Sequence, residues 1–375
     1  MKRFTFRKIS LKIQFWFWLY GILFVSMVLL GFNPYLFEST YKSPITAIYK
    51  TVARDRGVDF KCIWSVVDNR TKCKPVCGYG YFGLYGMETC HPWLDCEGLK
   101  NIKGHEKINT SVIGYVKEVW ISKWEDYEVA VKRLRTDLHG PESKDEFYRG
   151  IQFLRDFSDL PEVLQLVGQC KDTLVTELHA LNDATNLENH LKIYKDFDNA
   201  STRFRLCVDY VHILTMLHSG RGGKVYALCD ANDKYILLQQ YLLTDDFRLI
   251  INDIDSLVGF PVNDGVTEKR LCPVKTRNYS VLFNAPEQRW RPIEEKPFNN
   301  SKMSPYDEKI DIWKIPDACK SFLYHMDVKV KVLPHLNLIH QQCKSKDPKN
   351  RPNAKEVLKI YEDIYQKLFG IRINA

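Results

Sequence analysis

The sequence lacks internal repeats, low-complexity tracts and any stripe of basic residues. The first two absences exclude a repeat array, and the third removes the surface that a nucleic-acid partner would need. The net charge is +8, but five of the positive charges lie within the first twelve residues, which contain no acidic residue. With 375 residues, 45% of them hydrophobic, the chain can bury the core of one two-lobed domain of roughly 300 residues behind a short stem.

Charge is also missing from a long apolar run, Ile13 to Phe37. This run is long enough to cross a hydrocarbon core of ~30 Å as a helix, so we predict a transmembrane signal-anchor over residues 13–35. The basic residues 1–12 would keep the amino terminus in the cytosol and make the rest luminal. A cleaved signal peptide is the alternative, but its apolar core is usually shorter and is followed by small residues.

Five cysteines fall within 35 residues, in a stretch with weak helical or strand periodicity. Disulfides are typical of such a segment in a secretory chain, so we predict a luminal stem and cysteine-rich cap over residues 36–100. A zinc site is the competing interpretation, but the Cys-x3-Cys and Cys-x5-Cys spacings differ from the paired Cys-x2-Cys of common zinc ribbons. The cysteines are Cys62, Cys73, Cys77, Cys90 and Cys96.

Five Asn-x-Ser/Thr triplets agree with a luminal chain. Glycosylation of such triplets is possible only on the luminal side of the membrane. The triplets also arise by chance, so they fit a secretory protein without proving it. The candidate sites are Asn69, Asn109, Asn199, Asn278 and Asn299.

Three spaced fragments follow one another in the carboxy-terminal half: Ala285-Pro286-Glu287, Tyr306 to Trp313, and Asp347 to Pro352. They are typical of the carboxy-terminal lobe of a protein kinase. In that fold Glu287 would pair with Arg351, and Asp311 would hold the catalytic loop from below. The order therefore predicts an α+β, bilobal protein-kinase-like fold over residues 101–370, with a small β-rich lobe and a larger helical lobe.

Two lysines are candidates for binding nucleotide phosphates. Lys132 ends a Val-Ala-Val-Lys strand, the pattern whose lysine contacts phosphates in kinases. The loop before it should carry three glycines so that backbone amides can approach the phosphates, yet only Gly114 is in place. Lys117, just after this glycine-poor loop, is the second candidate. A solvent-facing strand lysine is the structural alternative for Lys132.

The helix after this strand departs from the kinase pattern. Gly150 stands where the glutamate that pairs with the strand lysine is expected. Either Glu146, one turn earlier, substitutes for it, or the phosphate-binding group is built differently. Further on, Glu177 and Leu178 end the last strand, where backbone groups of the hinge would meet the adenine.

The catalytic segment reads Leu228-Cys229-Asp230 in place of His-Arg-Asp. Asp230 would accept or orient the proton of the attacking hydroxyl. Because the loop carries an insertion, Asp233 is the fallback base and Asn232 a positioning group. Cys229 replaces the arginine that binds a phosphorylated activation loop in switchable kinases, so we expect constitutive activity.

Two metal-binding positions follow from spacing. In common kinases the asparagine that binds the second magnesium precedes the aspartate of Asp-Phe-Gly by thirteen residues. Gln240 lies thirteen residues before Asp253 and takes that place. The amide oxygen of Gln240 and the carboxylate of Asp253 are both hard ligands suited to Mg²⁺.

Taken together, several segments resemble the protein O-mannose kinase family. They are the degenerate glycine loop, the Cys-Asp-x-Asn-Asp catalytic segment, Gln-Tyr-Leu-Leu, Asn252 to Asp255, the Asp-Ile-Trp-Lys-Ile-Pro run and Cys90-x2-Trp93-Leu94-x-Cys96. The resemblance covers nearly all of the chain after the anchor. One departure is Val-Ala-Val-Lys132, which is more like an ordinary kinase.

The resemblance implies an ATP- and Mg²⁺-dependent (or Mn²⁺-dependent) kinase of the endoplasmic reticulum membrane, single-pass type II with a luminal catalytic domain. Its acceptor would be the 6-hydroxyl of mannose in a GalNAc-GlcNAc-Man trisaccharide, O-linked to glycoproteins such as α-dystroglycan. The alternatives are a secretory-pathway Ser/Thr/Tyr protein kinase and a pseudokinase scaffold. Missing glycines and Gly150 favour the last of these.

Overall fold

The computed structural model describes residues 52–55, 58–107, 117–135, 141–229, 231–255, 257–262, 283–289 and 306–373. These residues belong to one compact unit. No helix in this described part of the chain is long and apolar enough to cross a membrane. Outside it lie the predicted tail and anchor, together with Asn109, Gly114, Asp230, Asn278 and Asn299.

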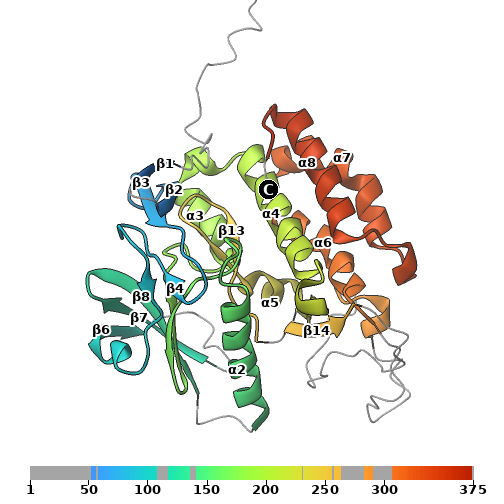
Figure 1. The fold of residues 1–375 in the computed structure, drawn as a ribbon. Helices are drawn as coiled ribbons and strands as arrows, with labels where there is room; N and C mark the ends of the chain where they lie inside the picture. Colours follow the sequence, from blue (N-terminus) through green and yellow to red (C-terminus); the bar gives the residue numbers. More distant parts are fainter. Residues whose placement is uncertain are drawn as a thin grey trace, which may run out of the picture. The chain divides into compact units, whose positions relative to one another are not determined.

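The first half of the unit is built on one antiparallel sheet, with strand order β6-β7-β8-β10-β9. Figure 1 labels three of its strands, β6, β7 and β8. Helix α2 (Pro141–Asp156) contributes Phe147, Ile151 and Leu154 to the hydrophobic core, which also holds Leu134 and Leu174 of the sheet. The helical spacing of these apolar residues thus explains the face that α2 buries. The strands are β6 (Lys103–Lys107), β7 (Lys117–Trp124), β8 (Tyr127–Leu134), β9 (Leu166–Cys170) and β10 (Thr173–Glu177).

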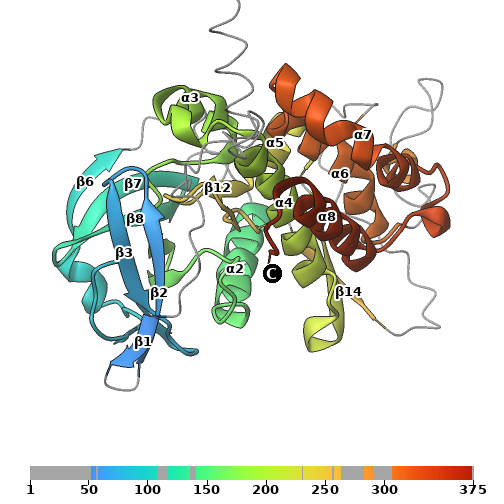
Figure 2. The same cartoon turned by 90° about the horizontal axis from the view of Figure 1, so that it is seen from above.

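The cysteine-rich cap precedes this sheet and is cross-linked by disulfides, as predicted. Cys62 pairs with Cys73 across two strands in register, Cys77 pairs with Cys90, and Cys96 reaches Cys170 on β9. The bonded sulfurs leave no thiolate there for zinc, so the competing interpretation was wrong. Figure 2 shows the cap strands β1 (Val52–Asp55), β2 (Val58–Ser65) and β3 (Arg70–Pro75); β4 (Tyr81–Phe82), β5 (His91–Pro92) and η1 (Gly98–Asn101) follow.

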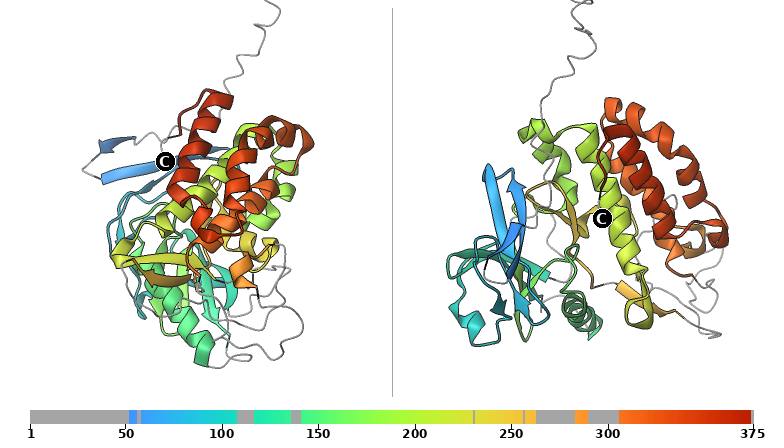
Figure 3. Two further views of the ribbon diagram at one scale, coloured as in Figure 1. Left: turned by 90° about the vertical axis from the view of Figure 1, so that its right-hand side faces the viewer. Right: turned by 45° about the horizontal axis from the view of Figure 1, so that its top comes forward.

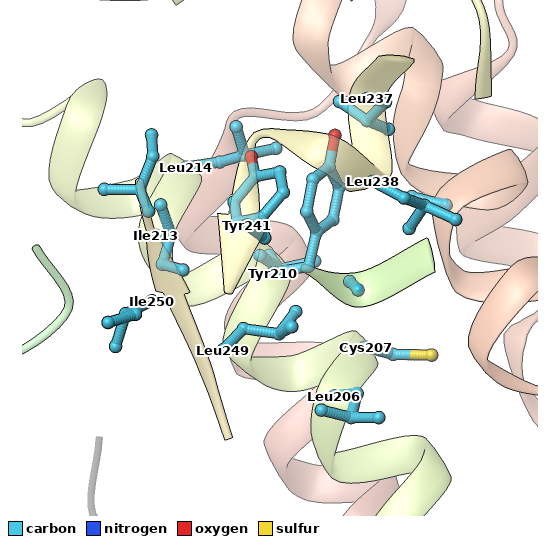
Figure 4. Close-up of a cluster of buried hydrophobic side chains, with 14 of the residues drawn as sticks. Leu206, Cys207, Tyr210, Ile213, Leu214, Leu237, Leu238, Tyr241, Leu249 and Ile250 are labelled. Atoms are coloured by element: carbon cyan, nitrogen blue, oxygen red, sulfur yellow. The ribbon is translucent and has the colours of Figure 1, made fainter. Parts of the chain in front are cut away.

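The second half is mainly helical and packs around α4 (Ala200–Leu217), most of whose residues are buried (Figure 3). Cys207 on α4 is disulfide-bonded to Cys319 on α6. Tyr210 and Tyr241 pack edge to face inside the apolar cluster of Figure 4. The other helices are α3 (Leu187–Ile193), α5 (Lys234–Gln239), α6 (Lys309–Phe322), α7 (Met326–Cys343) and α8 (Ala354–Phe369).

Short strand pairs and 3-10 turns connect these helices, and the β12–β13 pair lies between Gln240 and Asp253. Strand β11 (Lys224–Leu228) pairs with β14 (Leu257–Pro261), and β12 (Tyr241–Leu243) pairs with β13 (Leu249–Ile251). The turns are η2 (Ala184–Asn186), η3 (Lys195–Phe197), η4 (Arg221–Gly223), η5 (Pro286–Gln288) and η7 (Pro348–Asn350).

Residues of the three spaced fragments make buried polar contacts with one another and with the segment before Asp230. Arg351 donates to both carboxylate oxygens of Glu287, at 2.5 and 2.8 Å. Bidentate pairing of this kind fixes the relative positions of the two segments, which lie 64 residues apart. Asp311 is fully buried, and its Oδ2 accepts the backbone N–H of Leu228 at 3.0 Å.

Candidate active site

Two buried lysines of the sheet reach the same short segment, which follows β13. Lys117 is the first residue of β7, and Lys132 lies on β8, opposite Val119. Lys132 Nζ donates to Asn252 Oδ1 at 2.6 Å. Lys117 Nζ lies 3.1 Å from Asp253 Oδ1 and 2.6 Å from an Asp255 carboxylate oxygen. The fold thus brings both candidate lysines to the candidate metal-binding aspartate.

The two lysines have opposite electrostatic surroundings. Burial lowers the pKa of Lys117, but the nearby Asp253 and Asp255 carboxylates raise it by more, so its pKa is above the ordinary value. Burial and the Lys117 charge lower the pKa of Lys132 to about 7. Lys117 is therefore the permanent cation of the site. Lys132, whose bond is to a neutral amide, is close to losing its proton at neutral pH.

The two carboxylates also differ. Desolvation raises the pKa of Asp253, but Lys117 lowers it by more, so the pKa is below its ordinary value and Asp253 is ionised at neutral pH. Desolvation and the neighbouring Asp253 charge raise the pKa of Asp255 by more than Lys117 lowers it, to about 7. The Asp253 side chain is 41% exposed, whereas that of Asp255 is 11% exposed. Asp253 is thus the ionised and accessible carboxylate that a cation or a polyphosphate–cation complex would meet.

Gln240 lies directly beside Asp253. Its backbone carbonyl accepts the N–H groups of Asn252 and Asp253, at 2.8 and 3.3 Å. Its side-chain amide nitrogen donates to the Ile236 carbonyl at 3.1 Å, so the amide oxygen is the atom that could coordinate a metal. In the described part of the chain no group of three or more His, Cys, Asp or Glu side chains is arranged to hold a metal. One carboxylate and one amide are nevertheless enough for Mg²⁺ that keeps water and phosphate ligands.

The catalytic segment is held in place on both sides of Asp230, which itself lies outside the described residues. Upstream, the buried Lys314 donates to the Leu228 carbonyl at 3.1 Å, and Asp311 accepts the Leu228 N–H. Cys229 is disulfide-bonded. Downstream, the carbonyl of the buried Asn232 accepts the Asn284 side-chain amide at 3.1 Å. Fixed residues on both sides suit a segment whose task is to orient an acceptor hydroxyl.

Asp233 has a structural task of its own. Its carboxylate accepts the Ile236 N–H at 2.8 Å and caps α5, the short helix that ends just before Gln240. Asp233 therefore lies at a helix terminus. As a fallback base, Asp233 would have to act while one of its oxygens stays bonded to the helix.

At the predicted hinge, the Glu177 side chain stabilises the structure. It is buried at the end of β10, where one oxygen lies 2.5 Å from Lys74 Nζ and the other accepts the Gln165 N–H at 3.0 Å. Burial raises the pKa of Glu177, and Lys74 together with His179 lowers it well below the ordinary value. This link ties the cap to the sheet. Sequence reasoning missed Lys74, and a pair 103 residues apart leaves no sequence signal. Only backbone groups near Leu178 would meet an adenine.

A groove of about 750 Å³ adjoins the catalytic segment. Asp233 and Tyr235 line it from α5, and Tyr324 and Lys320 line it from the α6–α7 region. Tyr235 and Tyr324 are 47% and 64% exposed, and exposed aromatic rings beside polar groups suit an amphipathic ligand. These residues come from separate elements, so the sequence alone did not reveal the groove.

A cation on the sheet, an ionised aspartate with a neighbouring amide, and fixed residues on both sides of Asp230 are features that a kinase-type phosphotransferase site requires. No protein-family model matches the chain. The chain is 39% identical over 311 residues to the protein O-mannose kinase of Macaca fascicularis, covering 81% of this chain and 83% of that protein. It is 38% identical over 298 residues to the Homo sapiens protein of the same name (78% and 81%), and 38% over 293 residues to that of Gallus gallus (77% and 80%). The chain belongs to the protein O-mannose kinase family.

Proposed function

We propose that this protein transfers the γ-phosphate of ATP to the 6-hydroxyl of O-linked mannose within a GalNAc-GlcNAc-Man trisaccharide, on glycoproteins of the α-dystroglycan type. The observation that carries the proposal is that Lys117 and Lys132 both reach the polar segment that contains Asp253, in a chain of this family. Phosphoryl transfer depends mainly on positioning and charge neutralisation, and this cluster supplies both.

Each residue has a distinct task in this proposal. Lys117 is a fixed cation for the triphosphate, and Lys132 is a second donor beside it. Asp253 and the Gln240 amide oxygen would hold Mg²⁺ (or Mn²⁺), which supplies neutralisation of phosphate charge when bound. Asp230 would orient the mannose hydroxyl and take its proton. The groove lined by Tyr235 and Tyr324 would receive the rest of the glycan.

In this proposal the protein has a bilobal kinase-like fold and a single membrane anchor at its amino terminus. A protein-kinase-like bilobal fold is supported by the sheet, the helical half and the Glu287–Arg351 pair. A type II signal-anchor in the endoplasmic reticulum membrane is supported by the apolar run in the sequence and by the disulfides, which persist in oxidising compartments. Asn69, on the turn between β2 and β3, is an exposed glycosylation candidate, and Asn199 caps α4.

The decisive experiment incubates the luminal segment with labelled ATP, Mg²⁺ and a panel of acceptors. We expect label on the GalNAc-GlcNAc-Man trisaccharide and none on mannose-free glycans. Label on protein hydroxyls instead would replace the proposal with a secretory-pathway protein kinase. Tight nucleotide and Mg²⁺ binding without transfer to any acceptor would identify a pseudokinase scaffold.

A further inference from the structure

Gly150 leaves a gap in helix α2 that another side chain fills. A Cβ atom built on Gly150 would lie 2.0 Å from Asp255 Oδ1 and 3.0 Å from Asp255 Cγ. No real Cβ atom tolerates such a contact with a carboxylate, so any larger residue would displace Asp255. The Asp255 carboxylate therefore occupies the space that a side chain at position 150 would take.

The same carboxylate contacts the permanent cation of the site. The other oxygen of Asp255 lies 2.6 Å from Lys117 Nζ, closer than the 3.1 Å between Lys117 Nζ and Asp253 Oδ1. Both partners are buried, with side chains 10% and 11% exposed, so the contact is little screened by water. Asp255 thus lies between the helix backbone at Gly150 and the ammonium of Lys117.

From this geometry we infer that Asp255 is the positioning residue for Lys117 and replaces the helix glutamate that holds the phosphate-binding lysine in ordinary kinases. The inference rests on the proposed role of Lys117 toward nucleotide phosphates. The carboxylate comes from the loop that also carries Asp253, and α2 contributes the space at Gly150. The lysine is consequently held by the metal-binding segment, and its position does not depend on a glutamate at helix position 150.

The arrangement also assigns separate tasks to the two aspartates. Asp253 is the more exposed and shares Lys117 with Asp255, so it can turn to an incoming cation while Asp255 keeps the lysine in place. If Asp255 were absent, Asp253 would be the remaining carboxylate within ion-pair distance of Lys117 among the described residues. Nucleotide binding would then compete for the one carboxylate that the metal also requires.

The test compares nucleotide affinity, kinetic constants and thermal stability in four forms of the luminal segment. We expect Asp255→Ala to weaken ADP–Mg²⁺ binding and to raise the ATP KM by about ten- to a hundredfold, as loss of a charge-assisted contact would. The glycan KM should stay unchanged. Gly150→Ala should have an effect in the same direction, although Ala normally stabilises a helix relative to Gly. When Asp255 is already alanine, Gly150→Ala should weaken nucleotide binding no further.

A rescue variant separates positioning from a general structural role. Gly150→Glu combined with Asp255→Ala moves the carboxylate back to the helix and should recover most of the ATP affinity. Asp145→Ala, an exposed aspartate on the same helix, is the control that should leave every constant unchanged. If Asp255→Ala does not fold, Asp255→Asn, which keeps the volume, and Gly150→Ala provide the same comparison.

The inference is overturned if Asp255→Ala and Gly150→Ala bind nucleotide like the parent protein. It is also overturned if nucleotide affinity falls only in proportion to thermal stability and Gly150→Glu combined with Asp255→Ala restores none of it. Nucleotide affinity is measured without any acceptor. A parent protein that binds nucleotide but fails to phosphorylate the trisaccharide would therefore refute the proposed glycan acceptor and leave this test intact.

Discussion

Replacing Lys74 by methionine tests the link between the cap and the end of β10. The Lys74 and Glu177 side chains are 12% and 7% exposed, so the substitution leaves a buried carboxylate without its main countercharge. Breaking a buried pair from one side costs about 3–5 kcal/mol. We expect the lower end, about 3 kcal/mol, because the Gln165 N–H still bonds to Glu177 and His179 Nε2 lies 3.5 Å away.

The assay is thermal or urea unfolding of the segment that follows residue 35, with its disulfides intact. For a unit of about 300 residues, about 3 kcal/mol corresponds to a decrease in Tm of roughly 5 °C. Lys100→Met is the matched control. Lys100 pairs with Glu97 at 2.7 Å, but both side chains are more than half exposed, so the change in unfolding free energy should stay within about 0.5 kcal/mol.

The pH dependence gives an independent check. In the parent protein the pKa of Glu177 lies below its unfolded value, so the pair adds stability above the unfolded pKa of about 4.3 and loses it as the pH falls through the folded pKa. Without Lys74 the largest contribution that lowers the pKa of Glu177 is lost, so this pKa should be higher in the variant than in the parent. The gap in stability between Lys74→Met and the parent should therefore be largest near neutral pH and shrink as the pH falls from the variant's Glu177 pKa toward that of the parent.

The double variant Lys74→Met/Glu177→Leu completes a double-mutant cycle on this ion pair. Because it removes both charges, it should recover most of the stability that Lys74→Met loses. A single variant as stable as the parent, or a double variant as unstable as the single one, would refute the argument that an unpaired buried carboxylate is the cause.

Further predictions concern catalysis, metal, regulation and topology. Asp230→Asn should cut glycan phosphorylation by at least about a hundredfold while ADP binding survives; near-normal turnover would move the base to another residue. In magnesium titrations Asp253→Asn should abolish turnover and Gln240→Ala should weaken it less; the reverse order would mean that the loop is misaligned. Phosphatase treatment should leave activity unchanged, because the disulfide-bonded Cys229 cannot bind a phosphorylated loop as arginine does; loss of activity in folded enzyme would reveal a phosphorylation switch. In intact microsomes the domain should resist protease and carry glycosidase-sensitive glycans; a protease-sensitive, unglycosylated domain would place it in the cytosol.

Local patterns in the sequence were enough to predict the family, the two halves of the domain and the disulfide-bonded cap. The reason is that these features depend on residues close together in the chain, such as the apolar spacing of α2 and the fragments around Glu287, Asp311 and Arg351. A motif of this kind specifies its own helix, turn or ion-pairing group through local sequence, without contacts to distant parts of the chain. The spacing also gave Gln240 and Asp253 as neighbours, because a short hairpin, β12–β13, connects them.

Tertiary packing alone decided which groups meet at the site. The sequence left open which lysine binds phosphate and what replaces the helix glutamate. The structure pairs Lys117 with Asp253 and Asp255, and it places Asp255 against Gly150. These partners lie more than a hundred positions apart in the chain. Their meeting depends on how a sheet, a helix and a loop pack together, and a carboxylate can fill a neighbour's missing side chain only once that packing exists.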